Sequence, residues 1–371
     1  MKITIAGDSH GPCMIGVMEG IPAGFKIDTK KINHDLSRRQ GGYGRGNRMK
    51  LEQDEVQIIA GTWKGYTTGA PLVLSVENRA SNPVEKPRTV PRPGHADYSA
   101  WAKYGLPDLN AYTERSSARS TVVWVALGSV AKQFIELFNV KVYGYVVAIG
   151  SVCAETIPEK REELLKLRDE SVVYCPDSQI TKKMLEEIDK AKDSGDTLGG
   201  SFRVIAEGVP AGLGGYSTPF ERLDSRIASF FLAIPSIKGV IIGCEDFHRP
   251  GSQYHDEFHI ENGKIRRKSN NAGGIEGGIT NGEPIVVTAY LKPIPTLRKS
   301  LNSVDLKRKE PAKTSYIRSD TTVVPAASVV GEAALALVLM DAWLERWGCD
   351  NVDSIRRRYH EDISGWHDGV R

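Results

Sequence analysis

The sequence predicts one large α+β domain, spanning residues 1–371, in which buried helices are covered by sheets on both sides. The helical segments at 122–138, 223–234 and 328–347 are apolar on most faces, as helices buried on all sides are. Segments between them alternate apolar and polar residues, which is typical of strands with one buried face. With 371 residues and 40% hydrophobic content, the chain is long enough to bury a large core.

The first third of the chain combines short strands with long loops rich in glycine and arginine. Ile3 and Ile5 alternate with polar residues and predict a strand at the N-terminus. Long loops are expected at 7–11, 38–48 and 88–119. Loops of this length inside a compact domain usually line a functional site.

The remaining elements follow from periodicity and flanking residues. In chain order they are a helix at 122–138 capped by Ser120 or Thr121, a strand at 201–209, a helix at 223–234 opened by Asp224, a strand at 284–291, and a helix at about 328–347 ended by Gly348. Residues 155–193 are dense in Glu and Lys at helical spacing, and we expect them to form a solvated, peripheral helical layer.

Composition and charge narrow the class of protein. The net charge of +3 is too small for a general binder of polyanions, so the basic residues matter by their location. Five scattered cysteines form no CxxC pair, which predicts reduced thiols in a cytoplasmic compartment, and no signal peptide is visible. The longest apolar run, Ala333 to Met340, lies between Glu332 and Asp341 and is too short for a membrane span. We therefore expect a cytoplasmic protein without a membrane partner.

The most informative segment is 38–48, which reads RRQGGYGRGNR, with four arginines, four glycines and no acid. Arginine presents a planar fork of donors that matches carboxylate and phosphate oxygens. Glycines let the backbone approach a ligand closely. The segment predicts a site for a small, strongly anionic ligand.

The segment GDSHG at 7–11 admits three interpretations. It matches G-x-S-x-G, in which Ser9 would be a hydrolase nucleophile, but that motif normally leads into a helix and Pro12 follows here. Alternatively His10 is the functional group, because an imidazole can donate a proton to a leaving group. The third interpretation is an ordinary turn with a surface histidine. A second loop histidine, His95, favours the interpretation in which His10 is functional.

His95 lies in PRPGHAD, between Arg92 and Asp97. The prolines stiffen this loop, and Gly94 leaves the backbone free beside the imidazole. Together with His10 and the arginines, this loop predicts an acid–base site over an anionic substrate.

The segment ERSSARST at 114–121 places two arginines around two serines just before a buried helix. Hydroxyls and backbone N–H groups at a helix N-terminus can bind an anion. An ordinary helix cap explains the same residues equally well.

The second half of the chain holds further candidates. The loop at 270–282 has five glycines in thirteen residues and could pack against a flat cofactor or be a linker, and the chain contains no P-loop or Rossmann motif. Asp320 beside Arg318 is a candidate base, or half of a surface ion pair. His255 and His259 do not form H-E-x-x-H, so a polar loop is favoured there over a metal site.

Taken together, the motifs resemble the chorismate synthase family. They occur in the order and spacing of that family through nearly the whole chain, and they are GDSHG, RRQGGYGRGNR, RPGHAD, RSSAR, DSGDTLGG, NNAGGIEGGITNGEPI, KPIPT and RSD. The resemblance implies conversion of 5-enolpyruvylshikimate 3-phosphate to chorismate by anti-1,4-elimination of phosphate, the last common step of aromatic amino acid biosynthesis. It also implies reduced FMN as cofactor, NADPH as a candidate reductant of the flavin, and no metal. The substrate carries a phosphate and two carboxylates, which accounts for the arginines.

The resemblance assigns roles to matching positions. It implies that His10 stabilises the departing phosphate, that His95 lies near N(1) of the flavin, and that Asp320 acts near N(5) to help remove the C(6) hydrogen. The residues expected to bind the substrate anions are Arg39, Arg45, Arg48, Arg92, Arg119 and Arg318, and of these Arg39 and Arg45 are also linked to NADP. The expected FMN contacts are Arg115, Ser116, Ser117, Pro235, Ser236, Gly277, Lys292, Pro293, Ile294, Pro295, Thr296 and Arg318.

The family fold is a β-α-β sandwich, with helices between two antiparallel sheets, assembled as a homotetramer. The sequence departs from the family pattern at Asp8, where Glu is often seen, and at Ser120, where an acid is usual. Neither change removes a proposed catalytic group.

Two rival functions remain open at this point. GGYGRGNR resembles RNA-binding RGG segments, although those usually lie in disordered tails rather than between strands. A serine hydrolase acting through Ser9 is the other. The expected partner is the small-molecule substrate, with no nucleic acid.

Overall fold

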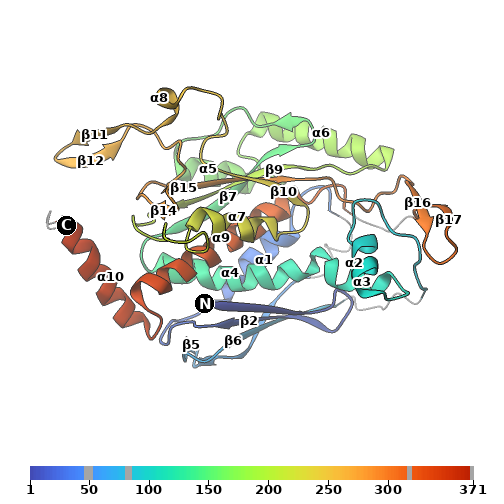
Figure 1. Cartoon of the computed structure of the whole chain (residues 1–371), viewed down its shortest axis with the longest axis horizontal. Helices are drawn as coiled ribbons and strands as arrows, with labels where there is room; N and C mark the ends of the chain where they lie inside the picture. Colours follow the sequence, from blue (N-terminus) through green and yellow to red (C-terminus); the bar gives the residue numbers. More distant parts are fainter. Residues whose placement is uncertain (46–52, 80–85, 316–319, 368–371) are drawn as a thin grey trace.

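Figure 1 shows helices between two antiparallel sheets in the computed structural model, which describes residues 1–45, 53–79, 86–315 and 320–367. This arrangement confirms the predicted α+β sandwich. The helices are α1 (Thr29–Gln40), α2 (Asp97–Tyr104), α3 (Asn110–Ser116), α4 (Thr121–Glu136), α5 (Arg161–Glu170), α6 (Ser178–Ser194), α7 (Leu223–Leu232), α8 (Gly251–Tyr254), α9 (Val324–Trp347) and α10 (Val352–His367).

The first sheet has four antiparallel strands in the order β1-β2-β6-β3. Their bounds are Lys2–Gly7 for β1, Cys13–Glu19 for β2, Leu72–Glu77 for β6 and Val56–Ala60 for β3. Ile5 pairs with Gly16, which pairs in turn with Leu74. A Cβ added at Gly16 would lie 3.0 Å from the side chain of Leu127, so α4 packs directly against this sheet.

The second sheet has five antiparallel strands in the order β10-β15-β9-β7-β8. Their bounds are Ile237–Ile242 for β10, Ile285–Leu291 for β15, Gly200–Glu207 for β9, Lys141–Ile149 for β7 and Val152–Cys153 for β8. The strands expected at 201–209 and 284–291 correspond to β9 and β15, which are inner strands of this sheet, with Val204 paired to Val287. Short hairpins complete the strands: β4 (Thr62–Trp63) with β5 (Tyr66–Thr67), β11 (Phe258–Glu261) with β12 (Lys264–Arg267), β13 (Ile275–Glu276) with β14 (Ile279–Thr280), and β16 (Asn302–Asp305) with β17 (Glu310–Lys313).

The helices α1, α4, α7 and α9 form the layer between the sheets (Figure 1). Among them α4 and α9 cross closely, because a Cβ added at Gly128 would lie only 2.3 Å from the Cβ of Ala333. One continuous cluster of buried apolar side chains runs from Met14 in the first sheet to Ile355 in α10. A helix with sheets on either side has little surface for solvent, which explains why α4 and α9 are apolar on most faces, whereas α1 and α7 each bury one face.

Glu332 is an acid in the middle of this core, and its side chain is only 1% exposed. Arg38 of α1 donates to both of its carboxylate oxygens at 2.8 and 2.7 Å, and Lys132 of α4 donates to it at 2.9 Å. The backbone N–H of Gly144 in β7 adds a hydrogen bond of 2.8 Å. Burial opposes ionisation, but the charges of Arg38 and Lys132 outweigh it and hold the pKa of Glu332 well below its usual range. Glu332 therefore ties α9 to α1, α4 and β7.

The charged segment 155–193 contains α5 and α6, which lie on the outer side of the five-stranded sheet (Figure 1). Asp177 caps α6 by accepting from the backbone N–H groups of Gln179 and Ile180. Met184 and Ile188 of α6 are buried at a spacing of four residues. The helix therefore presents an apolar stripe to the protein and its Glu and Lys residues to solvent.

Three helix starts differ from expectation. The last long helix begins at Val324 rather than near Ser328, because Pro325 sits in its first turn, where a missing N–H costs nothing. Ser120 precedes α4 but donates its hydroxyl to Ser117 O instead of capping the helix. Asp224 lies in the first turn of α7 rather than at its N-cap. Gly348 ends α9 as expected.

By length and composition α9 could cross a membrane. Its apolar window is 94% buried inside the protein, however, so its place between the two sheets accounts for its composition.

Candidate functional site

The segments singled out by the sequence converge where α3 meets the start of α4. His10 lies in the turn between β1 and β2, and Glu114 of α3 holds it there. His10 Nδ1 lies 2.7 Å from Glu114 Oε1, and the His10 backbone N–H donates to Glu114 Oε2 at 2.7 Å. Ser9 Oγ donates to the same Oε2 at 3.1 Å. Because the carboxylate takes Nδ1, Nε2 is the ring nitrogen available to a ligand.

This geometry does not fit a hydrolase that uses Ser9. Ser9 Oγ lies 3.0 Å from His10 Nδ1, the same nitrogen that Glu114 holds. In a Ser-His-acid triad the serine and the acid bind opposite nitrogens of the ring. GDSHG also joins two strands of a hairpin, whereas a nucleophile elbow joins a strand to a helix.

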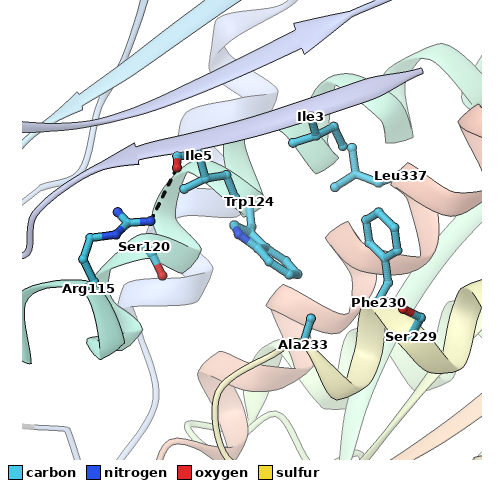
Figure 2. A pocket seen from close by; sticks show the side chains of 9 residues that line it. All are labelled: Ile3, Ile5, Arg115, Ser120, Trp124, Ser229, Phe230, Ala233 and Leu337. Carbon is cyan, nitrogen blue, oxygen red and sulfur yellow. Dashed lines mark hydrogen bonds between the residues drawn. The ribbon is translucent and has the colours of Figure 1, made fainter. Parts of the chain in front are cut away.

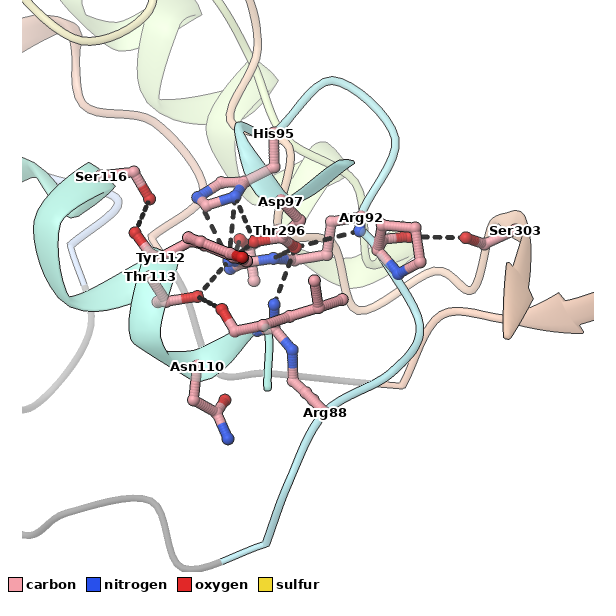
Figure 3. A network of polar contacts seen from close by, with 12 residues as sticks. Arg88, Arg92, His95, Asp97, Asn110, Tyr112, Thr113, Ser116, Thr296 and Ser303 are labelled. Carbon is pink, nitrogen blue, oxygen red and sulfur yellow. Dashed lines mark hydrogen bonds and ion pairs between the residues drawn. The ribbon is translucent and has the colours of Figure 1, made fainter. Parts of the chain in front are cut away.

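His95 lies just before α2, against Arg92 and Asp97 (Figure 3). Its Nδ1 lies 2.7 Å from Asp97 Oδ1. Arg92 Nη2 lies 3.1 Å from Nδ1 and 3.2 Å from Nε2, so the guanidinium rests against the imidazole. Arg92 also donates to Thr113 Oγ1 at 3.0 Å and to Thr296 Oγ1 at 2.9 Å. One arginine thus joins the His95 loop to α3 and to the 292–296 loop.

Asp97 is the centre of this network and has no exposed side-chain surface. Besides His95, it accepts from Arg88 Nη2 at 2.7 Å and from Arg92 Nε at 2.9 Å. Burial opposes its ionisation, but the hydrogen bonds from His95 and Arg92 outweigh burial and hold the pKa of Asp97 well below its usual range. A permanent carboxylate therefore fixes both His95 and Arg92.

Helix α3 connects the two histidines. Thr113 accepts from Arg92 beside His95, and the next residue, Glu114, binds His10. Arg115 then donates to the carbonyl of Gly7, at the start of the His10 loop. Three consecutive residues of one helix therefore hold both loops.

A second group of charges surrounds Asp54. Arg119 Nη1 donates to Asp54 Oδ1 at 2.7 Å, and Arg39 Nη1 lies 3.5 Å from Oδ2. Arg45 Nη1 lies 3.2 Å from Asp320 Oδ2. The group brings together three of the predicted anion-binding arginines and the predicted base.

Arg39 is buried in this group at 5% exposure and donates to Thr121 Oγ1 at 2.9 Å. Burial lowers its pKa to about 9 against the opposing effect of Asp54, with Arg45 and Arg119 lowering it further. The guanidinium is still charged at neutral pH. Within the described part of the chain, Arg39 Nη1 and Arg45 Nε are buried without a hydrogen-bond partner. Buried donors of this kind favour an incoming acceptor, such as a ligand oxygen.

The predicted flavin loops lie beside the His95 loop. Lys292 Nζ donates to the carbonyl of Gly94 at 2.7 Å, and the Lys292 backbone N–H donates to Ser236 O at 3.0 Å. Thr197 of the DSGDTLGG segment donates to Ile294 O at 2.7 Å. Ser236 has a φ of 75°, a left-handed conformation that is uncommon outside glycine and often marks a functional position.

The ERSSARST serines take part in local contacts. Ser116 Oγ donates to Tyr112 O at 2.7 Å, and Ser117 Oγ accepts from the backbone N–H of Arg119 at 3.3 Å. The segment therefore serves as a helix cap, and it also lies beside both histidine loops.

Two predicted site residues fall outside the described part of the chain, and a third lies away from this cluster. Arg48 and Arg318 lie outside the described residues. Gly277 lies in the turn between β13 and β14, at the opposite end of the molecule from α2 and α3 (Figure 1). Its position gives it no contact with His95 in the same chain.

Sequence reasoning missed three residues that organise the site: Glu114, Asp54 and Asn78. Asn78 donates to the carbonyls of Asp8 and Gly11 at 2.9 and 2.8 Å and accepts from Arg119 at 2.7 Å. The only sequence signal was for Glu114, an acid directly before the two arginines of a candidate anion cradle.

The arginine segment does not resemble an exposed RNA-binding tail. Arg38 and Arg39 end α1 and are buried against Glu332 and Asp54. Guanidiniums that are held inside the protein cannot follow a nucleic-acid backbone. His255 and His259 fall at α8 and β11, and no group of three metal-ligating side chains occurs within the residues described.

A separate apolar cavity of about 410 Å³ lies behind Arg115 (Figure 2). Its lining comes from β1, α4, α7 and α9 and the residues that precede α4, and consists of Ile3, Ile5, Arg115, Ser120, Trp124, Ser229, Phe230, Ala233 and Leu337. Arg115 points from this cavity toward the β1 carbonyls, so the cavity and the His10 loop share one side chain.

Comparison with known proteins identifies the family to which the chain belongs. The family model described as chorismate synthase matches residues 1–344. The chain is 56% identical to a chorismate synthase of Thermotoga maritima over 370 residues, covering 100% of this chain and 98% of the relative. It is 48% identical to a chorismate synthase of Carboxydothermus hydrogenoformans, covering 95% and 96% of the two chains. A crystal structure of chorismate synthase superposes with a TM-score of 0.81 at 37% identity, covering 98% of this chain and 97% of that one. The chain therefore belongs to the chorismate synthase family and is an enzyme of the shikimate pathway.

Proposed function

We propose that this site binds 5-enolpyruvylshikimate 3-phosphate beside reduced FMN and eliminates phosphate in a 1,4 sense to give chorismate. The observation that carries the proposal is the convergence of His10, His95 and Asp320 with Arg39 and Arg45, each of which has one buried donor that makes no hydrogen bond within the described residues. A phosphate and two carboxylates would supply acceptors for those donors. Arg39, Arg45, Arg92 and Arg119 are the described arginines that we assign to the substrate, and Arg48 and Arg318 remain assigned by the family motif alone.

The residues beside His95 fit a flavin. Lys292 is a cation beside the His95 loop, and its partial burial together with the charge of Lys238 lowers its pKa. Thr296 and the left-handed Ser236 place polar groups next to it. Arg115, Ser116, Ser117 and the 292–296 loop would hold FMN on this side, and reduced FMN, when bound, supplies electron density that weakens the C–O bond to phosphate.

The chain's own groups would handle the protons and charges. His10, with Nδ1 held by Glu114, presents Nε2 to donate a proton to the departing phosphate. His95 would donate a hydrogen bond to the flavin, with its orientation set by Asp97. Asp320 would assist removal of the C(6) hydrogen, and Arg45 holds its carboxylate in the site.

The test is anaerobic turnover. Purified protein, FMN reduced by dithionite and enolpyruvylshikimate phosphate should release phosphate and form chorismate, followed by its absorbance, and oxidised FMN should give no product. Adding NADPH to oxidised FMN tests whether the chain reduces its own flavin. Absence of product with reduced FMN demonstrably bound would contradict the proposed substrate.

We also propose that the chain acts as a single cytoplasmic domain that assembles as a homotetramer. The continuous core supports one domain, and the cysteines, all free thiols, fit a reducing compartment. Tyr216 and Phe220 are 77% and 88% exposed, in the segment that packs on the Gly277 hairpin. Apolar side chains this exposed favour contact with another copy of the chain. Such a contact would bring Gly277 of one subunit to the flavin bound by its neighbour. Light scattering should give four times the chain mass of 40.7 kDa.

Replacing Arg45 with lysine should raise the KM for the substrate by roughly tenfold or more while changing kcat little, because a point charge cannot form the bidentate contact of a guanidinium. The lysine keeps the charge opposite Asp320, so the fold should be unaffected. Steady-state kinetics with saturating reduced FMN measure both constants. Arg357→Lys on the exposed face of α10 is the matched control. An unchanged KM in R45K would remove Arg45 from substrate binding.

A further inference from the structure

Glu114 makes three contacts with the His10 loop, and neither the sequence motifs nor the family resemblance assigned it a role. Its Oε1 meets His10 Nδ1 at 2.7 Å, and its Oε2 accepts from the His10 backbone N–H at 2.7 Å and from Ser9 Oγ at 3.1 Å. The side chains of His10 and Glu114 are 26% and 23% exposed, so the contact lies at the edge of the site rather than on the open surface. The contact spans 104 residues of sequence.

We propose that Glu114 is the positioning residue for His10: its carboxylate holds the Nδ1–H of the protonated ring and turns Nε2–H toward the phosphate that leaves. This inference rests on the proposed role of His10. A histidine whose Nδ1–H is unheld can rotate about χ2, and Nε2–H then faces the ligand only part of the time. An acceptor at Nδ1 removes that freedom, as the aspartate does in hydrolase triads.

The contacts require a carboxylate rather than an amide. Both oxygens of Glu114 accept hydrogen bonds, one from the ring and the other from the backbone and Ser9. A glutamine has one acceptor and one donor group. Whichever way its amide turns, either His10 Nδ1 or the His10 backbone N–H faces a donor, so the isosteric change breaks the arrangement.

Neighbouring contacts make α3 a rigid support for this carboxylate. Arg115 donates to Gly7 O on one side of Glu114, and Thr113 accepts from Arg92 on the other. Tyr112 anchors the same helix through its hydroxyl, which donates to Leu106 O at 3.1 Å. Because α3 is fixed on both sides of Glu114, the direction of the His10 ring follows from the position of the helix.

The test is Glu114→Gln in the full-length enzyme with reduced FMN. We expect kcat to fall about 10- to 100-fold, the usual cost of losing the outer partner of a functional histidine, while the KM for the substrate and FMN affinity stay unchanged. Proton NMR should show a downfield, hydrogen-bonded Nδ1–H resonance of His10 in the unsubstituted protein, and this resonance should move upfield or disappear in E114Q. Glu163→Gln on the exposed face of α5 is the matched control.

A double-substitution experiment separates positioning from a structural role. In a His10→Ala background, E114Q should cause no further loss of kcat, because the residue that it positions is gone. An additional tenfold loss there, or an Nδ1–H resonance that stays unchanged in E114Q, would overturn the inference. Glu114→Asp keeps the charge and shortens the reach, so its kcat should lie between those of the unsubstituted protein and E114Q, and it serves as the test if E114Q does not fold.

The outcomes also distinguish this inference from the proposed function. Normal turnover of H10A would remove His10 from the mechanism and the proposal for Glu114 with it. A defective H10A together with normal E114Q and E114D would leave the proposed function intact and overturn the role of Glu114 alone.

Discussion

Replacing His10 with alanine is expected to lower kcat for phosphate elimination by about 100-fold or more, the range typical for a lost general acid. The departing phosphate then leaves without a proton donor, while the flavin contacts near His95 and Lys292 remain in place. FMN affinity, measured by titrating flavin fluorescence, should therefore change little. Single-turnover phosphate release under anaerobic conditions measures the chemical step directly.

The control for this change is His34→Ala, which removes an exposed imidazole from α1. H34A should turn over at the rate of the unsubstituted protein. If H10A and H34A had the same kcat, His10 would hold the loop in shape without taking part in the reaction. A parallel loss of FMN binding in H10A would instead point to a disrupted site.

Replacing Glu332 with glutamine should lower the free energy of unfolding by about 3–5 kcal/mol, the usual cost of breaking a fully buried ion pair on one side. The amide fills the same space but removes one of the two carboxylates that balance Arg38 and Lys132, and it leaves Asp35 alone against both cations. Urea unfolding at pH 7 measures the loss. Glu345→Gln is the matched control, because Glu345 lies on the same helix and pairs with Arg226 at the surface with 58% of its side chain exposed. Loss of that exposed pair should lower the free energy of unfolding by at most about 1 kcal/mol.

The buried contact of Glu332 with Arg38 and Lys132 also predicts how the free energy of unfolding depends on pH. The pKa of Glu332 in the folded protein lies below its ordinary value of 4.5. Its stabilising contribution is therefore complete above that value and is lost as the pH falls from 4.5 through the folded-state pKa. The difference in stability between the unsubstituted protein and E332Q should narrow over that interval. A difference that stayed constant into acid would contradict the charged state assigned to Glu332.

The layered fold could be predicted because a helix that is buried on most sides is apolar on most faces, and this composition can be read from each helix by itself. The segment 122–138 is apolar on nearly every face, and the structure places it between two sheets. Glu332 shows where this reasoning stops. In the sequence Glu332 directly precedes an apolar run, but in the structure it lies within α9 and is buried. Its partner Arg38 is 294 residues away, so no local pattern indicates that the charge is compensated.

The site could be predicted to the extent that its parts are contiguous in sequence. Asp97 follows His95 by two residues, and the loop PRPGHAD contains both members of that contact. The carboxylate that holds His10 comes from helix α3, 104 residues further along the chain, and periodicity and residue type carry no information about that pairing. The segment 38–48 was predicted to bind an anionic ligand, and Arg38 at its start contacts the buried carboxylate of Glu332 in the core.

The distances in sequence between these partners bear on how the enzyme acquires activity during folding. His10 meets a residue 104 positions away, Arg92 one 204 positions away, and Arg38 one 294 positions away. Contacts between residues so far apart in the sequence form slowly, because chain entropy must be lost before they stabilise the fold. The charges at the site can thus be desolvated only once both sheets have closed on the central helices. Regain of turnover during refolding should then lag behind the recovery of helical signal, which makes catalysis itself a reporter of the last folding step.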